Sequence, residues 1–266
     1  MDYKYFPHTE DDLAAMLAKV GVKDLDGLYA QIPESIRFRG DYDIPSEMSE
    51  MEVRETFKKL GSLNKQLTCF AGYGVYDHYI PSVVPNLVQR SEFLTSYTPY
   101  QAEISQGTLH YIFEYQSMMA ELTGMDVSNA SMYDGSTACA EAMMMAVAAG
   151  KKQNKVLVSE AITTDRYMVL REYARQHGIE MEMIPEKDGV TDLSSLKSQL
   201  SGGDVAGVVV FQPNAYGIIE DYTGFADACH EHKALFIMDC VAADLALLKT
   251  PGERGADIAV GDGQRR

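Results

Sequence analysis

The stretch that decides the fold is residues 205–239, VAGVVVFQPNAYGIIEDYTGFADACHEHKALFIMD. It begins with a continuous apolar run, Val205–Phe211, and ends with a second one, Ala234–Met238, with an amphipathic segment at about Phe225–His232 between them. This order predicts a strand, a helix and a strand. Apolar runs without polar alternation are typical of strands buried on both faces, so we expect a mainly parallel sheet covered by helices.

The same alternation extends on both sides of this stretch, from Lys155 to the end of the chain. Short apolar runs predict strands, and amphipathic segments predict helices that end at a glycine or begin at an aspartate. The further strands are expected at Val156–Ser159, Ile179–Ile184 and Asp257–Val260, and the further helices at Asp165–His177 and from Asp192 onward. Ligands of such sheets bind beyond the carboxyl ends of the strands, so the residues there are the first candidates for a site.

The first half of the chain has a different pattern. Helices are predicted at about Glu10–Val20 and Ser46–Leu63, joined by a charged stretch with Pro and Gly interruptions, and a longer helix at about Gly107–Leu122. We therefore expect an N-terminal helical arm, residues 1–66, followed by one large domain, residues 67–266.

Charge and composition exclude several classes of function. The chain has 39 acidic and 23 basic residues, and its net charge of -16 repels phosphate backbones and anionic lipids. We expect neither a nucleic-acid nor a membrane partner, and no apolar run has the length of a signal peptide or a membrane span. The four cysteines and the histidines lack metal-ligand spacing, which predicts reduced thiols in a cytoplasmic protein without a metal site.

The turn Asp134-Gly135-Ser136-Thr137 opens a predicted helix rich in Ala and Met. Free backbone N–H groups and the helix dipole make such a terminus a seat for a phosphate, and the two hydroxyls can add donors. An ordinary N-cap explains the same residues, and caps of this type are common. Both interpretations remain open on this motif alone.

Two polar residues follow predicted buried strands at the expected ligand-binding edge. Asp239 comes directly after Ala234–Met238, where an aspartate could pair with the protonated ring nitrogen of pyridoxal phosphate or could simply cap the next turn. Asn214 lies in the loop at 211–217, FQPNAYG, which a tight turn also explains.

Residues 96–107, SYTPYQAEISQG, are too polar and aromatic for a typical core segment. Such a composition favours a binding surface or an interface. The candidates for contact with a substrate or a partner are Tyr97, Thr98, Tyr100 and Gln101.

Several long strings occur in a fixed order along the chain. They include FAGYGVYDHYIP at 70–81, YTPYQAEISQG at 97–107, LTGMDVSNASMYDG at 122–135 and GADI at 255–258. Together they closely resemble the glycine cleavage system P-proteins, and among these the first subunit of the two-subunit form. The resemblance covers nearly the whole chain and is far more specific than any single motif.

This resemblance implies the type I pyridoxal-phosphate (aminotransferase-like) fold, an α/β large domain with a mainly parallel sheet, preceded by the helical arm. It implies the activity of glycine dehydrogenase (decarboxylating), in which glycine loses carbon dioxide and its aminomethyl group passes to the lipoyl H-protein. By position, Ser136 and Thr137 match the phosphate-side turn and Asp239 matches the partner of the pyridine nitrogen, with Asn214 as a further cofactor-side residue.

One departure from the fold's usual pattern concerns the lysine that forms a Schiff base with the cofactor. It is expected shortly after the strand that follows Asp239, but that stretch, GDGQRR at 261–266, has no lysine. Arginine stays protonated and cannot replace the amine, and Lys249 precedes the last predicted strand. The resemblance therefore implies a chain without a catalytic lysine, whose partner, P-protein subunit 2, holds pyridoxal phosphate. Ser136, Thr137 and Asp239 would then be relics of a duplicated ancestor.

Members of the family continue beyond the position of Arg266, so we expect a truncated chain that would be poorly soluble and inactive alone. Two other interpretations remain open. The chain could be a catalytically silent scaffold of the same fold, or a self-sufficient pyridoxal-phosphate enzyme.

Overall fold

The computed structural model describes residues 7–68, 70, 79–94, 97–150 and 152–263 of the 266-residue chain. Cys69, most of the string at 70–81 and the last three residues of GDGQRR lie outside the described residues. The chain divides into two compact units, Met1–Thr68 and Cys69–Arg266, which we describe separately. The assignment of residues 1–66 as an arm and 67–266 as one large domain stays a prediction.

The N-terminal unit consists of short helices. Among its described residues, 7–68, the α-helices are α1 (Glu10–Val20) and α2 (Glu50–Gly61), and the 3-10 turns are η1 (Leu25–Tyr29) and η2 (Glu34–Ile36). Helix α1 has the predicted bounds, whereas α2 is shorter than predicted. None of the described residues 7–68 is buried, so these helices have no core of their own.

Local capping explains where the two helices begin. The Thr9 hydroxyl accepts a hydrogen bond from the N–H of Asp12 at 3.2 Å, and the Asp12 carboxylate accepts one from the N–H of Thr9 at 2.8 Å. Ser49 and Glu52 form the same capping box at the start of α2, which is why this helix does not begin at Ser46. Such boxes satisfy N–H groups that the first turn of a helix leaves free.

The second unit contains a five-stranded sheet in the order β2-β1-β5-β6-β7, and every neighbouring pair is parallel. The strands are β1 (Lys155–Ser159), β2 (Glu180–Ile184), β5 (Val205–Gln212), β6 (Leu235–Cys240) and β7 (Ile258–Val260). The register places Phe211 beside Asp239 and Asp239 beside Val260, so the carboxyl ends of β5, β6 and β7 meet at one edge. This confirms the predicted α/β class with a mainly parallel sheet.

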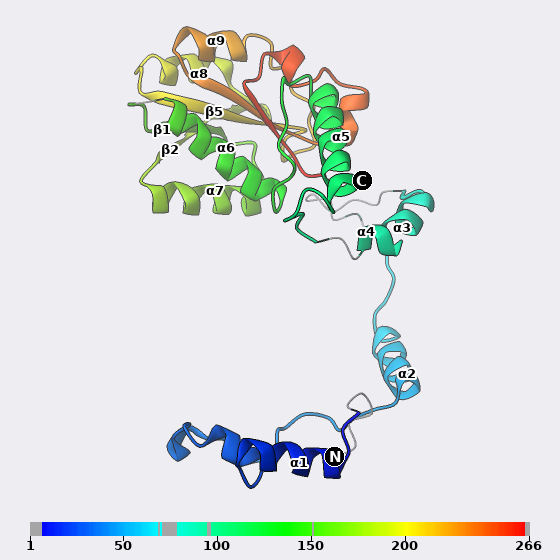
Figure 1. Ribbon diagram of the computed structural model, residues 1–266. Helices are drawn as coiled ribbons and strands as arrows, with labels where there is room; N and C mark the ends of the chain where they lie inside the picture. The colour runs from blue at the N-terminus through cyan, green and yellow to red at the C-terminus, as the bar shows by residue number, and fades with distance from the viewer. Residues whose placement is uncertain (1–6, 69, 71–78, 95–96, 151, 264–266) are drawn as a thin grey trace. The chain divides into compact units, whose positions relative to one another are not determined.

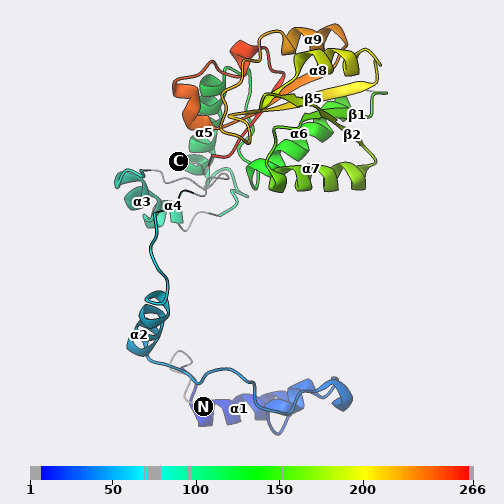
Figure 2. The same cartoon turned by 180° about the vertical axis from the view of Figure 1, so that it is seen from behind.

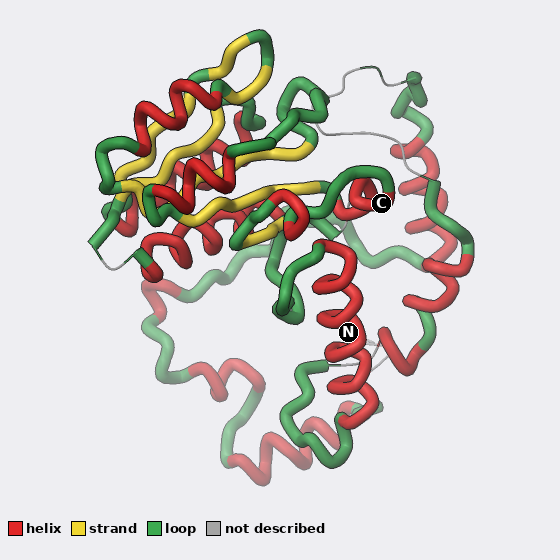
Figure 3. The backbone as a smooth tube through the Cα atoms, turned by 90° about the horizontal axis from the view of Figure 1, so that it is seen from above, coloured by secondary structure: helices red, strands yellow, loops and turns green. Residues whose placement is uncertain are grey.

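Helices cover both faces of the sheet, as Figures 1 and 2 show from opposite sides. The four helices are α6 (Gly135–Ala149) and α7 (Thr164–His177) on one face, and α8 (Leu193–Leu200) and α9 (Phe225–Glu231) on the other. In β5, Val209 and Phe211 belong to the core under α6 and α7, while Val208 and Val210 belong to the core under α8 and α9. All of β5 is buried, as its continuous apolar run predicts. Figure 3 looks onto the sheet from above, with the strands in yellow and helices in red overlapping them.

A small antiparallel hairpin that was not predicted is formed by β3 (Glu186–Lys187) and β4 (Val190–Thr191). Asp188 and Gly189 join its strands with φ angles of 56° and 78°, and an Asp-Gly pair is a strong signal for such a turn. The remaining elements are α3 (Val83–Val88), α4 (Ser91–Leu94), α5 (Gln106–Thr123), η3 (Ala242–Ala246) and η4 (Gly252–Arg254). Helix α5 lies beside η3 (Figure 1).

Two further findings hold for the part of the chain that the structure describes. No helix there is both long and apolar enough to cross a membrane. No three His, Cys, Asp or Glu side chains gather there in a way that could hold a metal ion.

Candidate functional site

The candidate site lies where the carboxyl ends of β6 and β7 approach the first turns of α6 and α7. Asp239 is 4% exposed and lies inside β6, which runs to Cys240 and not only to Met238 as predicted. Its backbone pairs with both neighbouring strands, which fixes its position at the sheet edge. The expected location of Asp239 at this edge is thus observed, although its assignment as a residue after the strand is corrected.

The Asp239 carboxylate is already engaged by an arginine of the same chain. Arg166, the third residue of α7, donates a hydrogen bond from Nη1 to Oδ2 of Asp239 and forms an ion pair with it. The side chains of the two residues are 11% and 4% exposed, so water screens this pair little. Arg166 was not among the predicted site residues. The sequence feature that could have pointed to Arg166 is a cation in the first turn of a helix, where the dipole disfavours positive charge.

Asp134 caps the start of α6, as the N-cap interpretation of the Asp-Gly-Ser-Thr turn predicts. The Asp134 carboxylate accepts a hydrogen bond from the N–H of Thr137 at 2.7 Å. This bond lowers the pKa of the Asp134 carboxyl, and the nearby Arg166 charge acts in the same direction. Ser136 and Thr137 themselves are half-buried in the first turn. The helix start, which could bind an anion, therefore already binds the carboxylate of Asp134.

Gly135 connects this helix start to the ion pair. A Cβ atom at Gly135 would lie 2.7 Å from Nη2 of Arg166 and 3.2 Å from Cβ of Asp262, closer than side chains normally approach. Asp262 lies just after β7, the strand beside β6 in the sheet. We refer to Asp134, Gly135, Arg166, Asp239 and Asp262 as the Arg166 cluster.

Two thiols near this cluster are unreactive. Cys139 in α6 and Cys240 at the end of β6 are buried free cysteines. Burial raises the pKa of each thiol to about 12, despite the opposing effect of the Arg166 charge. Both therefore stay protonated near neutral pH and are poor nucleophiles.

Asn214 lies in a separate polar network on the loop after β5. Its Nδ2 donates to the carbonyl of Gly189 at 2.7 Å and to Oε1 of Glu220 at 2.8 Å, and its Oδ1 accepts from the N–H groups of Tyr216 and Ile218. Two donors and two acceptor positions are all that an amide side chain offers. In this arrangement Asn214 holds the loop together and has no hydrogen-bonding capacity left for a ligand.

The residues expected on the substrate or partner side are at the surface. Tyr97 and Tyr100 are each 80% exposed, with ring centroids 6.3 Å apart, and Thr98 and Gln101 are exposed as well. Their phenol, hydroxyl and amide groups are thus accessible in the chain by itself.

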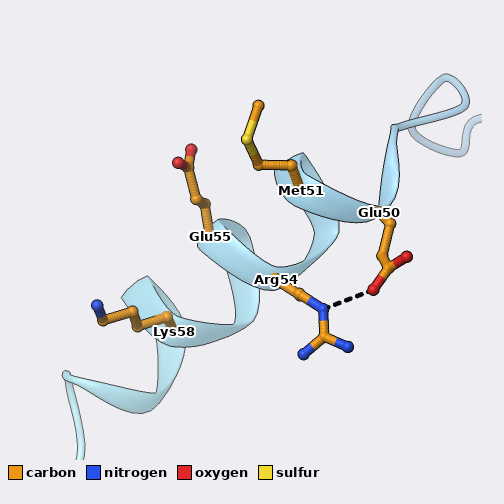
Figure 4. Close-up of a pocket in the computed structure, with 5 residues that line it drawn as sticks. All are labelled: Glu50, Met51, Arg54, Glu55 and Lys58. Carbon is orange, nitrogen blue, oxygen red and sulfur yellow. Dashed lines mark hydrogen bonds and ion pairs between the residues drawn. The ribbon is translucent and has the colours of Figure 1, made fainter.

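A hollow beside α2 has none of the features of a ligand site. Figure 4 shows its lining residues, Glu50, Met51, Arg54, Glu55 and Lys58, all from one helix and pointing in different directions. Arg54 pairs with Glu50 at 2.8 Å on an exposed surface. Ligand sites have converging groups, so we assign no function to this hollow.

Comparisons with known proteins agree with the resemblance found in the sequence. A curated relative from Listeria monocytogenes serotype 4a (strain HCC23), named "Probable glycine dehydrogenase (decarboxylating) subunit 1", is 49% identical over 265 residues. The alignment covers 98% of this chain and 59% of the relative. A relative of the same name from Anoxybacillus flavithermus (strain DSM 21510 / WK1) is 47% identical, with 99% and 59% covered. This chain thus spans about three fifths of the length of these relatives.

A solved structure of glycine decarboxylase (P-protein) of the glycine cleavage system, in inhibitor-bound form, matches with a TM-score of 0.87 and 43% identity. The match covers 99% of this chain and 59% of that one, and it confirms the expected type I pyridoxal-phosphate fold. The family model described as "Glycine cleavage system P-protein" matches residues 3–266. The chain therefore belongs to the glycine cleavage system P-protein family.

Proposed function

We propose that this chain acts as the non-lysine subunit, subunit 1, of a two-subunit glycine dehydrogenase (decarboxylating). The complex would release carbon dioxide from glycine and pass the aminomethyl group to the lipoyl H-protein. Subunit 2 would hold pyridoxal phosphate, whose ring takes up the electrons left by the departing carboxylate. A cytoplasmic location is part of the same proposal.

The observation that carries the proposal is the state of the sheet edge in this chain. Asp239 occupies the position expected for the partner of the pyridine nitrogen, but Arg166 neutralises it. The sequence that follows β7, GDGQRR, offers no lysine amine. An aspartate that is already paired within the chain supports a role in which a partner supplies the cofactor site, and this fits the "subunit 1" in the names of the relatives.

Within this proposal the expected cofactor-side residues have structural roles. Ser136 and Thr137 form the first turn of α6, where the Thr137 N–H binds Asp134. Asn214 ties its loop to the buried Glu220. These residues and Asp239 would be retained from an ancestral cofactor site that this chain no longer uses.

Tyr97, Thr98, Tyr100 and Gln101 are the residues that we propose for the partner or substrate side. Their exposure and their mix of aromatic rings and hydrogen-bonding groups support this role, since tyrosine is enriched in protein interfaces.

The test is the exchange of labelled bicarbonate into glycine. We expect exchange only when this chain, the lysine-bearing subunit, pyridoxal phosphate and H-protein are all present. If leaving out this chain does not change the rate, it is a catalytically silent scaffold and the proposal fails. If this chain alone forms an aldimine that borohydride traps and supports exchange, it is a self-sufficient enzyme and the proposal also fails.

A further inference from the structure

The loss of a lysine does not by itself prevent a chain from binding pyridoxal phosphate. The phosphate and the ring could still be held without a covalent bond, by the turn before α6 and by Asp239. The proposed function, on which this inference rests, leaves open whether this chain binds the cofactor without a covalent bond. The Arg166 cluster answers this question.

The guanidinium of Arg166 reaches both positions where the cofactor would be anchored. Its Nη1 binds Asp239, the expected partner of the ring nitrogen. Its Nη2 lies 2.7 Å from the Cβ position of Gly135, at the expected phosphate-side turn. One guanidinium is much smaller than a substituted pyridine with a phosphate arm. Because one guanidinium binds the first position and lies against the second, the two positions are too close together to hold the larger cofactor between them, and the residues present do not fit it.

Displacing Arg166 to admit the cofactor would be costly. Its side chain is only 11% exposed and Asp239 only 4%, so separating them would leave a buried carboxylate and a buried guanidinium without each other. Removing one partner of a buried ion pair is strongly destabilising, because the remaining charge loses its compensation.

The charge of the cluster also disfavours a phosphate. Among the described residues, the Arg166 cluster contains one guanidinium and three carboxylates, those of Asp134, Asp239 and Asp262. Asp134 feels the Arg166 charge, and the Asp262 side chain lies within 3.4 Å of the same point beside Gly135 as Nη2 of Arg166. A phosphate dianion at this turn would meet the carboxylates of Asp134 and Asp262, and like charges at this range repel.

We infer that Arg166 acts as a built-in counter-ion that closes this chain's own cofactor site. Asp239 no longer serves a cofactor but anchors α7 to the carboxyl edge of β6. The site is closed independently of the missing lysine, so the chain does not take up pyridoxal phosphate even without a covalent link.

Equilibrium dialysis of the full chain with 4′-deoxypyridoxine 5′-phosphate tests this directly. This analogue keeps the ring and the phosphate but lacks the aldehyde, so it cannot form imines with surface lysines. We expect no saturable binding up to about 1 mM. Stoichiometric binding at micromolar concentration would overturn the inference whatever the outcome of the exchange assay, and the exchange assay can fail without affecting this result.

A second test measures the ion pair by thermal unfolding. Arg166→Ala and Asp239→Ala should each lower the Tm by about 10 °C, and the double variant by less than the sum of the two. Millimolar N-methylguanidinium should restore part of the Tm of Arg166→Ala but not that of the double variant. The control is Arg175→Ala, which removes an exposed arginine of the same helix paired with Glu172 at 2.6 Å and should shift the Tm by less than about 2 °C.

The two single variants need not fold well for this test to be decisive. A double variant with apolar replacements, Arg166→Met with Asp239→Leu, removes both charges and keeps side-chain volume, and it should be at least as stable as either single variant. Additive effects of the two single substitutions, or equal loss of stability in the Arg175→Ala control, would contradict a specific pair between Arg166 and Asp239.

Discussion

The described residues before and after Gly135 differ in what determines their structure. From Gly135 onward, two cores lie on the two faces of the sheet, with residues such as Met143 and Phe236 completely buried. Among the described residues from 7 to 134, none is buried, and large apolar side chains such as Phe57 and Phe113 are each 68% exposed.

The difference shows two ways in which a sequence determines structure. Strands β5 and β6 are determined by burial, because their apolar runs have a core to enter. Helices α1 and α2 are determined locally, by the hydrogen bonds of their capping boxes. Exposed apolar side chains on this scale are typical of surfaces that another chain or domain covers, which agrees with the proposed second subunit.

The largest expected effect comes from a phenylalanine in each region. Phe236 in β6 is 0% exposed and Phe57 in α2 is 68% exposed. We expect Phe236→Ala to lower the free energy of unfolding by about 3–5 kcal/mol, because it leaves a cavity in the core. The matched change, Phe57→Ala, should alter it by less than about 0.5 kcal/mol. Denaturant unfolding of the chain measures both.

A similar loss of stability in the two phenylalanine variants would contradict the contrast between the regions. It would mean that α2 has a core that the contacts within this chain do not show.

A glycine in each region gives the next largest effect, with opposite signs. At Gly207 in β5, a Cβ atom would lie 2.8 Å from Cβ of Ala146 in α6, so Gly207→Ala should cost about 1–3 kcal/mol through overpacking. At Gly61, the last residue of α2, a Cβ atom meets nothing within 4 Å. Gly61→Ala should raise helix stability by about 0.5 kcal/mol, because alanine loses less backbone entropy. Unfolding curves for Gly207→Ala and helicity by circular dichroism for Gly61→Ala are the measurements.

If Gly207→Ala were neutral, α6 would not pack on β5 as closely as the structure shows. The tight fit between this helix and the sheet would then not contribute to the difference between the residues before and after Gly135.

Much of the fold was predictable because its signals are local or periodic. The apolar runs gave β5 and most of β6, Gly178 ended α7 in a left-handed conformation, and Asp192 began α8. The end of β6 was missed because a polar residue, Asp239, continues the strand, and only its pairing with neighbouring strands shows this.

The site was less predictable because its contacts are not local. Asp239 and Arg166 are 73 positions apart in the sequence, and no periodic pattern connects them. The role of Asn214 depends on Gly189 and on the buried Glu220, which a strand-by-strand analysis does not bring together. Sequence patterns thus located the edge of the sheet, while the engagement of Asp239 by an arginine needed the structure.

The smallest expected effect concerns the pH dependence of the capping boxes in the N-terminal region. Hydrogen bonds from Thr9 lower the pKa of the Asp12 carboxyl, and those from Ser49 lower the pKa of the Glu52 carboxyl. Because the folded pKa lies below the unfolded one, each carboxylate stabilises its helix above the unfolded value of about 4 and loses this effect as the pH falls through the lowered folded value. The double variant Asp12→Asn with Glu52→Gln should have less helix than the unchanged chain at about pH 6, and circular dichroism should show the difference shrinking as the pH falls below about 4. A difference that stays constant over this range would mean that the charges of these two side chains do not determine where α1 and α2 begin.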